Sequence, residues 1–413
     1  MGQGTSRPDK IIQDLPEDER YFGFENFGNT CYCNSVLQAL YFCTPFRQRV
    51  LQYASQLSSR SDPKESILTC LAELFAQINA QRKKTGYLSP RKFVGKVKAE
   101  NELFSGYMHQ DAHEFLNYLL NDVSESLARE TKAATANGKS HHAPPISSSF
   151  HVRTPSLQAL HQMQQQQQQG NINGTGTNSG PISTWVDEIF QGKLVNETRC
   201  LRCDSVTSRQ ESFYDLSLEI GTNCSVTACL RQFSSNETLD GADKFSCDEC
   251  GCKQEAQKRM RVASLPPVLC LHLKRFKYVE SAGQMQKLTH RVVFPFHLKL
   301  TNTTDTCPDA DAEYSLTAVV VHMGAHVNHG HYVALVKSAG KWVCFDDEVV
   351  HGITEAQVQS TFGHTQQPVV RADGAGNGHV DHAYILFYQK RSPGGERGSN
   401  DCGDAEVVEA KVV

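Results

Sequence analysis

Cys31 has the surroundings best suited to nucleophilic chemistry in this 413-residue chain. It follows Thr30, a residue type that caps helices, and it opens an apolar stretch with helical spacing, so we expect it in the first turn of a helix. A helix N-terminus stabilises negative charge and therefore favours the thiolate, which is the attacking form of cysteine. Asn26, five residues earlier, could offer its side-chain amide to a carbonyl oxygen that becomes negative during attack. A lone cysteine at such a position is, however, more often a buried structural residue.

A histidine and two aspartates later in the chain could complete a catalytic group. His331 opens one strand-like run, and after the hairpin turn typical of Ser338-Ala339-Gly340 a second run ends at Asp346 and Asp347. Adjacent antiparallel strands would bring His331 to Asp346, so that the carboxylate orients the imidazole and the other ring nitrogen takes a thiol proton. Asp347 is an alternative orienting acid, which the spacing does not exclude. Gly330 favours His331 as the base, because a glycine leaves room for substrate backbone; the nearest competing histidines are His322 and His329.

Two CxxC pairs predict a metal site. Cys200 and Cys203 form the first pair and Cys247 and Cys250 the second, and four thiolates from two tight turns suit a closed tetrahedral zinc site. A closed site leaves no open coordination position, so the zinc would be structural. The long gap between the pairs fits two elongated hairpins whose tips meet, and Cys252 is interpreted as a non-ligand because it breaks the paired pattern. A redox-active CxxC is the alternative.

These residues need elements that position them, and the sequence predicts a helical part followed by a strand-rich part, an α+β fold. Helical spacing from Tyr21 to about Ala128 places two groups on helix faces: Val36, Leu37, Leu40 and Tyr41, then Phe115, Leu116, Leu119, Leu120 and Val123. After Trp185 the chain turns strand-like, with short apolar runs at residues 268–273, 316–321, 332–336 and 384–388.

Composition divides the chain further. Residues 1–20 are predicted to be a disordered lead and residues 21–390 a catalytic domain, followed by a disordered tail over 391–413. Within the domain, the Ser-, Asn- and Gln-rich stretch of about 131–183 is interpreted as a disordered insertion, and about 184–262 as a zinc-bearing subdomain.

Charge and hydropathy exclude several classes of protein. A net charge of -4 disfavours nucleic-acid binding, and no apolar run reaches the length of a transmembrane helix. The polar N-terminus lacks a secretory signal, so we expect a reducing location, cytoplasmic with the nucleus as a second location. Gly2 fits the N-myristoylation pattern and is a candidate site for a weak lipid anchor.

Four motifs in order resemble those of the ubiquitin-specific proteases, which are papain-like deubiquitinases. They are the block around Cys31, the Gly330-His331-Tyr332 segment, Phe345-Asp346-Asp347, and Gln110 to Phe115. The similarity runs from about Tyr21 to Lys390, with the insertion between. It implies a papain-like fold with a helical thumb, a β-rich palm and zinc-braced β fingers that grip ubiquitin.

The resemblance also implies roles for individual residues. Cys31 would be the nucleophile, His331 the general base, Asp346 its orienter and Asn26 the oxyanion donor in cutting ubiquitin from modified proteins. Substrate-binding residues would be Asp111, which could pair with arginines of the ubiquitin tail, together with Gln110 and Tyr332. Phe24 and His109 depart from the residues usual in the family.

Longer stretches are similar to a small branch of the family that is activated by WD40-repeat proteins. The resemblance therefore implies β-propeller partners that bind the fingers and palm, and it rests on residues 26–43, 189–192, 196–200 and 253–260.

Two other interpretations remain open, and a third is disfavoured. The same fold could serve as a non-catalytic ubiquitin-binding module, which the intact set of Cys31, His331 and Asp346 disfavours. The chain could instead be an isopeptidase for another ubiquitin-like protein. A zinc-ribbon nucleic-acid binder is disfavoured by the long gap between the CxxC pairs and by the net charge.

Overall fold

The computed structural model describes residues 11–57, 64–106, 108–137, 182–280, 283–325, 329–363 and 381–391. Two compact units make up the chain: Met1–Ser124 with Trp185–Val413, and Glu125–Thr184. The candidate lipid site at Gly2, nearly all of the Gln-rich insertion and the C-terminal tail lie outside the described residues. Those three predictions therefore stay predictions.

The N-terminal part of the first unit is mainly helical, as its sequence spacing predicts. A short parallel pair of strands, β1 (Tyr21–Phe24) and β2 (Thr85–Leu88), also lies within this stretch. The final helix runs to Asn137, nine residues beyond the predicted end of helical spacing at Ala128. The helices are α2 (Cys31–Phe42), α3 (Thr44–Leu57), α4 (Ile67–Asn79), α5 (Arg91–Glu100), α6 (Glu102–Ser105) and α7 (Ala112–Asn137).

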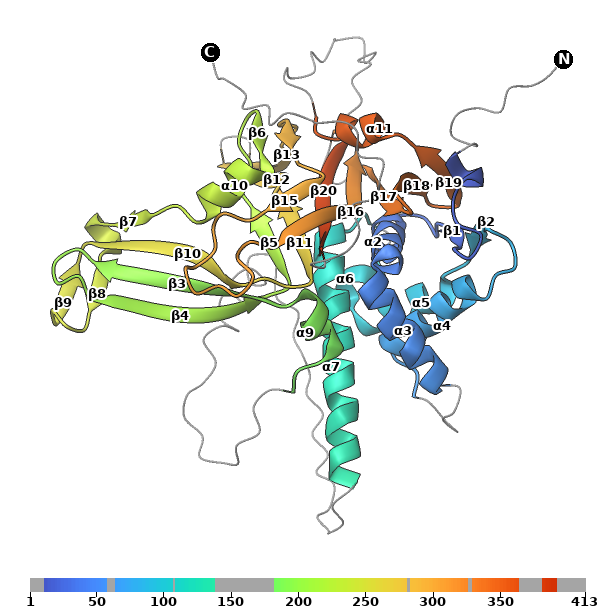
Figure 1. Cartoon of the computed structure of the whole chain (residues 1–413), viewed down its shortest axis with the longest axis horizontal. Helices are drawn as coiled ribbons and strands as arrows, with labels where there is room; N and C mark the ends of the chain where they lie inside the picture. The colour runs from blue at the N-terminus through green and yellow to red at the C-terminus, as the bar shows by residue number, and fades with distance from the viewer. Residues whose placement is uncertain are drawn as a thin grey trace. The chain divides into compact units, whose positions relative to one another are not determined.

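Helix α2 is the central helix of the domain. All of its residues are buried, because it packs against the sheet strands β16, β17 and β18 and against helix α3 (Figure 1). The apolar face predicted for this helix lies in the core, but the opposite face is buried as well. Phe115, Leu116 and the other predicted face residues of α7 are also buried. A helix that is covered on all sides can hold its first residue rigidly at a buried site.

An eight-stranded sheet forms the other half of the core. Its strands follow the order β19-β18-β17-β16-β20-β11-β5, with β15 added beside β16, and almost all neighbours are antiparallel. Apolar residues of both its central and outer strands form one cluster. The strands are β5 (Asp215–Leu218), β11 (Val268–Leu273), β15 (His297–Lys299), β16 (Glu313–Met323), β17 (His331–Ser338), β18 (Lys341–Asp346), β19 (Val349–Ile353) and β20 (His382–Lys390).

A second sheet of four strands, in the order β4-β3-β10-β7, is long and largely exposed. Figure 1 shows its strands extending away from the larger sheet, with the small hairpin of β8 and β9 at their outer end. The strands are β3 (Gly192–Cys200), β4 (Val206–Phe213), β7 (Glu237–Leu239), β8 (Phe245–Cys247), β9 (Cys252–Gln254) and β10 (Ala256–Ser264).

The prediction that the chain turns strand-like after Trp185 misses three short helices. They are α9 (Trp185–Phe190), α10 (Val226–Phe233) and α11 (Glu355–Ser360). Two of them begin at a side-chain cap: Ser225 accepts a hydrogen bond from Ala228 N, and Thr354 makes a capping box with Gln357. Helices of six to eight residues are too short to show a clear period in the sequence.

The remaining strands make two small pairs, β12 with β13 and β14 with β6. Their bounds are β6 (Cys224–Ser225), β12 (Phe276–Val279), β13 (Gln284–Lys287) and β14 (Val292–Val293). Among the helices of the described part of the chain, none combines the length and the apolar character needed to cross a membrane.

Candidate active site

Cys31 is the first residue of α2, as predicted, and it is 1% exposed. Thr30 occupies the N-cap position and its carbonyl accepts a hydrogen bond from Asn34 N, but its hydroxyl does not cap the helix. That hydroxyl instead accepts a hydrogen bond from Phe27 N and donates one to Asn26 Oδ1. The loop before the nucleophile is thus held by its own polar groups, and Gly28 turns it with a φ of 84°.

His331 and Asp346 meet across the hairpin of β17 and β18. The ladder closes at Ser338 and Lys341, so Ala339 and Gly340 form a two-residue turn, and both have positive φ as type I′ turns require. His331 opens β17 and Asp346 closes β18, which places the imidazole Nε2 2.6 Å from Asp346 Oδ1. The bond occupies Nε2 and leaves Nδ1 for the thiol.

Electrostatics favour the protonated form of His331. The hydrogen bond to Asp346 and a second one to Cys31 together raise the pKa of His331 to about 10, against a desolvation penalty from its partial burial. The same bond lowers the pKa of Asp346 below its usual value. A protonated imidazole beside the thiol stabilises the thiolate, which is the reactive form.

The second acid, Asp347, has a different set of contacts. Its Oδ2 is 3.8 Å from His331 Nε2, beyond hydrogen-bond distance, and Oδ2 accepts a hydrogen bond of 2.7 Å from Asn26 Nδ2. Its Oδ1 accepts one of 2.8 Å from Asn34 Nδ2, and burial raises its pKa. Of the two acids that the spacing left open, Asp346 is the one that bonds to His331, while Asp347 holds two asparagines.

Asn26 is oriented from both ends of its amide. Its Oδ1 accepts hydrogen bonds from Thr30 N at 3.2 Å and from the Thr30 hydroxyl at 3.1 Å, so Nδ2 must face Asp347. The backbone N–H of Asn26 donates to Glu348 Oε1 at 3.0 Å. The Nδ2 group has two N–H bonds, and the contact with Asp347 uses one of them.

The three predicted substrate-binding residues are placed differently. Asp111 lies at the start of α7, where Oδ1 accepts a hydrogen bond of 2.7 Å from His113 N and Oδ2 accepts one of 2.5 Å from the Tyr384 hydroxyl. Tyr332 is 3% exposed, with its ring against those of His322 and Tyr384. Gln110 is partly exposed beside Asp111. Asp111 and Tyr332 thus already have partners within the chain, and their contact with substrate stays a prediction.

Gly330 is required for a different reason from the one the sequence suggested. A Cβ at this position would lie 2.3 Å from His322 Nε2 and 2.6 Å from Met323 O. The glycine therefore leaves room for a buried side chain of the neighbouring strand, and room for substrate backbone at this position stays a prediction. Gly23 has a comparable role, because its Cβ would lie 2.3 Å from Asp347 O.

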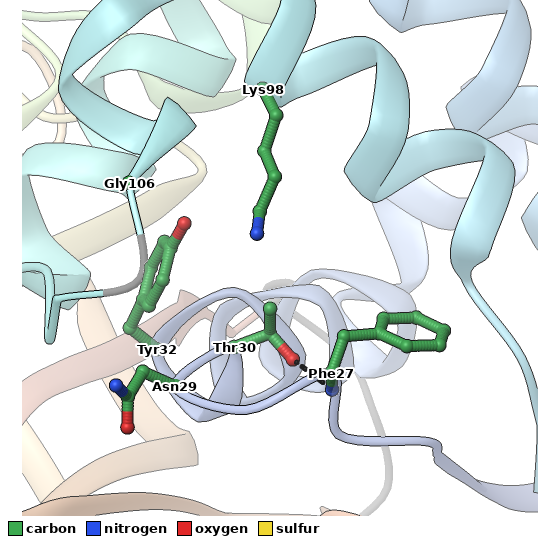
Figure 2. Close-up of a pocket in the computed structure, with 6 residues that line it drawn as sticks. All are labelled: Phe27, Asn29, Thr30, Tyr32, Lys98 and Gly106. Atoms are coloured by element: carbon green, nitrogen blue, oxygen red, sulfur yellow. Dashed lines mark hydrogen bonds between the residues drawn. The ribbon is translucent and has the colours of Figure 1, made fainter.

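Two residues near the site were not predicted to belong to it. Asn34, one turn after Cys31 on α2, holds Asp347; a polar residue on a largely apolar helix is the signal that could have identified it. His109 has its pKa lowered by burial and by the charges of His331 and His329. A small pocket flanks the same helix start, where the Tyr32 hydroxyl and the Lys98 amine point toward one space (Figure 2).

The four cysteines predicted to bind metal form one cluster. The turn between β3 and β4 carries Cys200 and Cys203, and the short hairpin of β8 and β9 carries Cys247 and Cys250. Only the first of these hairpins is elongated. The sulfurs lie within 4.8 Å of one another, with Cys203 3.6 Å from Cys247 and Cys200 4.0 Å from Cys250. Tetrahedral zinc with sulfur ligands at about 2.3 Å separates its sulfurs by about 3.8 Å, so this cluster could hold a zinc ion.

Comparisons with known proteins identify the family of this chain. The family model described as "Ubiquitin carboxyl-terminal hydrolase" matches residues 22–388. Ubiquitin carboxyl-terminal hydrolase 4 of Arabidopsis thaliana is 51% identical over 94% of this chain and 99% of its own length. Ubiquitin carboxyl-terminal hydrolase 12 of Salmo salar is 46% identical over 95% of this chain and 96% of its own.

Solved structures share the fold. The SAGA DUB module of Ubp8, Sgf11, Sus1 and Sgf73 bound to monoubiquitin matches 94% of this chain and 72% of the solved chain, with a TM-score of 0.64 and 23% identity. The same module bound to ubiquitin aldehyde matches equally well, with 22% identity. The predicted α+β, papain-like fold is confirmed. The extent and identity of the matches show that this chain belongs to the ubiquitin carboxyl-terminal hydrolases, and that it is a deubiquitinating cysteine hydrolase of the ubiquitin-specific protease type.

Proposed function

We propose that the chain hydrolyses the bond after the C-terminal glycine of ubiquitin on modified proteins, with Cys31 as nucleophile and His331 as general base. The observation that carries this assignment is the joint position of a buried thiol at a helix start and an imidazole that Asp346 holds at 2.6 Å. The pKa of His331, raised to about 10, supports a protonated imidazole beside the Cys31 thiol at neutral pH.

In the proposed reaction the Cys31 thiolate attacks the carbonyl carbon of the terminal glycine. His331 then gives its proton to the leaving amine, and a thioester joins ubiquitin to Cys31. A water molecule, deprotonated by His331, hydrolyses the thioester and restores the thiol. Asp346 keeps the imidazole oriented and stabilises its positive charge in each step.

Asn26 is proposed to stabilise the oxyanion. Asp347 and Thr30 hold both ends of its amide, so the amide need not reorganise when the carbonyl oxygen becomes negative. One N–H of its Nδ2 is committed to Asp347, and we assign the second N–H to the oxyanion. Asp347 is then a positioning residue for Asn26, and Asp346 orients the histidine.

The four-cysteine cluster is proposed to bind a structural zinc ion. Cys200, Cys203, Cys247 and Cys250 would supply four thiolates, which complete the coordination of zinc and leave no position for a substrate. The metal would join the β3–β4 hairpin to the β8–β9 hairpin and stiffen a sheet with little core of its own. Cys252, whose sulfur donates to Cys250 O at 3.3 Å, remains outside the set.

Ubiquitin is proposed to bind between the active site and the fingers, by which we mean the sheet β4-β3-β10-β7 with the β8–β9 hairpin. This position is in line with the ubiquitin-bound structures that share the fold. WD40-repeat proteins are proposed as activators that bind the fingers. Two exposed apolar residues support a protein contact there: Leu201 is 44% exposed beside the cysteine cluster, and Val206 is 57% exposed at the start of β4.

Hydrolysis of ubiquitin-amidomethylcoumarin by the purified, zinc-loaded chain tests the enzymatic proposal. We expect release of the fluorophore that Cys31→Ala abolishes while the variant still binds ubiquitin. A labelled vinyl sulfone of ubiquitin should modify Cys31, and probes built from other ubiquitin-like proteins should react far more slowly. If a probe built from another ubiquitin-like protein reacts equally fast, the chain is better explained as an isopeptidase for that protein. If the folded chain forms no adduct and hydrolyses nothing, a non-catalytic ubiquitin-binding module is favoured.

The activator proposal has a separate test. Addition of a WD40-repeat protein should raise kcat, and Leu201→Asp with Val206→Asp should remove the stimulation but leave the basal rate unchanged. Met285→Asp is a matched control, since Met285 is 46% exposed on β13, outside the fingers sheet. Stimulation that persists in the Leu201 and Val206 variant would refute the fingers as the contact.

A further inference from the structure

Cys224 and Cys229 form a close pair of thiols apart from the candidate active site and from the four-cysteine cluster. Cys224 lies in β6, and Cys229 lies in the first turns of α10, which begins after the N-cap residue Ser225. The turn from strand to helix brings their sulfurs to 3.5 Å, which is van der Waals contact. A disulfide between them therefore needs little movement of the chain.

The two thiols are not equivalent. Cys224 is partly exposed, whereas Cys229 is 4% exposed. The contact with Cys229, together with the positive charge of Arg275, lowers the pKa of Cys224 to about 6, and the same contact raises the pKa of Cys229. The pair thus joins a partly exposed sulfur with a lowered pKa to a buried sulfur with a raised one.

The burial and hydrogen bonds of Arg275 also bear on the charge at this place. Its side chain is fully buried, and it donates from Nε to Ala383 O at 2.6 Å and from Nη1 to Leu288 O and His290 O. Its Nη2 is buried without a hydrogen-bond partner among the described residues. Burial lowers the pKa of Arg275 to about 10, and the two cysteines are the groups that counteract this effect. A buried guanidinium is stabilised by a counter-charge, and a thiolate at Cys224 would supply one.

We propose that Cys224 and Cys229 are a peroxide-sensitive dithiol, in which Cys224 is the attacking sulfur and Cys229 the resolving one. The Cys224 thiolate attacks one oxygen of a hydroperoxide, the O–O bond breaks, and hydroxide leaves, so that Cys224 becomes a sulfenic acid. The Cys229 sulfur then attacks the Cys224 sulfur, and the S–O bond breaks with loss of water. Overall, two thiols and one hydrogen peroxide give one disulfide and two waters.

Oxidation would change more than the two sulfurs. A disulfide carries no charge, so Arg275 would lose its counter-charge while it still holds the Leu288 and His290 carbonyls. The next residue before Leu288, Lys287, donates from Nζ to His322 O and Gly324 O, at the end of β16. The dithiol is therefore linked through buried cations to the chain segment that precedes His331.

Peptide mapping of the full-length, zinc-loaded chain tests the proposal. Trypsin should release residues 210–231, which contain Cys224 and Cys229 and no other cysteine. After mild hydrogen peroxide this peptide should lose two hydrogen atoms, and dithiothreitol should restore its mass. The peptide of residues 65–82 is the internal control, because its cysteine, Cys70, is buried with a raised pKa. We expect the dithiol to react roughly tenfold faster or more.

Two variants test the assignment of the sulfurs. In Cys229→Ser, the sulfenic acid on Cys224 cannot be resolved and should be captured by a dimedone probe. In Cys224→Ser, Cys229 should remain unlabelled under the same conditions. The proposal is overturned if the wild-type peptide keeps both free thiols when Cys70 is oxidised, or if Cys229 is labelled in Cys224→Ser as fast as Cys224 is in Cys229→Ser. The peptide mapping of the wild-type chain tests the proposal without either variant, so it remains valid if a variant folds poorly.

Discussion

Replacement of Asp346 by asparagine tests the proposed catalytic group most directly. The bond from His331 Nε2 to Asp346 Oδ1 is 2.6 Å long, and the two side chains are 33% and 44% exposed. Hydrogen bonds between charged partners contribute about 1.5–3 kcal/mol, and solvent screening at this exposure favours the lower end, about 1.5–2 kcal/mol. At about 1.4 kcal/mol per factor of ten, kcat/KM of Asp346→Asn should fall roughly 10- to 30-fold.

The same substitution should change the pH dependence. His331 must be protonated to hold the thiolate, so activity should be lost as pH rises through its pKa, which is about 10 in the native protein. Without the carboxylate this pKa falls toward its ordinary value of 6.5, and the alkaline limb of kcat/KM should move to lower pH. The sign for stability is the same: a raised histidine pKa stabilises the fold below pH 6.5, and this contribution fades as pH rises toward 10.

Ubiquitin-amidomethylcoumarin hydrolysis between roughly pH 6 and 10 would measure the fall in kcat/KM and the shift of its alkaline limb. Asp347→Asn is the matched control, because Asp347 holds Asn26 and Asn34 and does not hydrogen-bond to His331. The rate of Asp347→Asn should fall, but the alkaline limb of its kcat/KM should stay at the same pH as in the parent. A limb that moves in Asp347→Asn and stays in Asp346→Asn would refute the assignment of the two acids.

Four further predictions concern other parts of the chain. Asn26→Ala should lower kcat about 100- to 1,000-fold with little change in KM in steady-state kinetics, and an unchanged kcat would exclude it as oxyanion donor. Metal analysis should find about one zinc per chain in the parent and in Cys252→Ser but none in Cys247→Ser, whose melting temperature should also be lower. Zinc retained in Cys247→Ser would contradict the proposed ligands. Ala339→Asn should raise the free energy of unfolding in urea by about 0.5–1 kcal/mol, because Ala339 has a φ of 47° in a type I′ turn and asparagine adopts positive φ more readily than alanine. A loss of stability would contradict this account of the turn. Burial and the charge of Arg275 lower the pKa of Lys287 to about 7, so Lys287 binds more protons in the unfolded chain than in the folded one between about pH 7 and 10.5. Its contribution to the free energy of unfolding should therefore rise with pH over this range, opposite in sign to the contribution of His331. Lys287→Met should remove the rise, and an unchanged pH dependence in the variant would exclude Lys287 as a source.

The elements that carry the site follow from local features of the sequence. Residues 268–273 were predicted as a strand from their apolar run, and β11 has these bounds. The Ser338-Ala339-Gly340 segment indicated a hairpin, and β17 and β18 meet there. Such features depend on neighbours within a few residues, where backbone preference and turn chemistry act directly.

Fine assignments within the site depend on contacts between distant segments. Asn26 and Asp347 are separated by 321 residues, and their hydrogen bond distinguishes the role of Asp347 from that of Asp346. Gly330 must be a glycine because the side chain of His322, eight residues earlier on the neighbouring strand, fills the space of its Cβ. The short helix α10, which sets the distance between Cys224 and Cys229, gave no clear period in the sequence.

By itself, the sequence determined which residue types were available for chemistry and on which local elements they lie: a cysteine at a helix start, a histidine and two acids around a hairpin, and four cysteines in two tight turns. The tertiary structure alone decided which acid meets the histidine, what orients Asn26, and that the sulfurs of Cys224 and Cys229 come into contact. The reason is physical: helix starts and hairpins are set by neighbouring residues, whereas hydrogen bonds and counter-charges depend on angstrom-scale distances between side chains that only the packed core brings together.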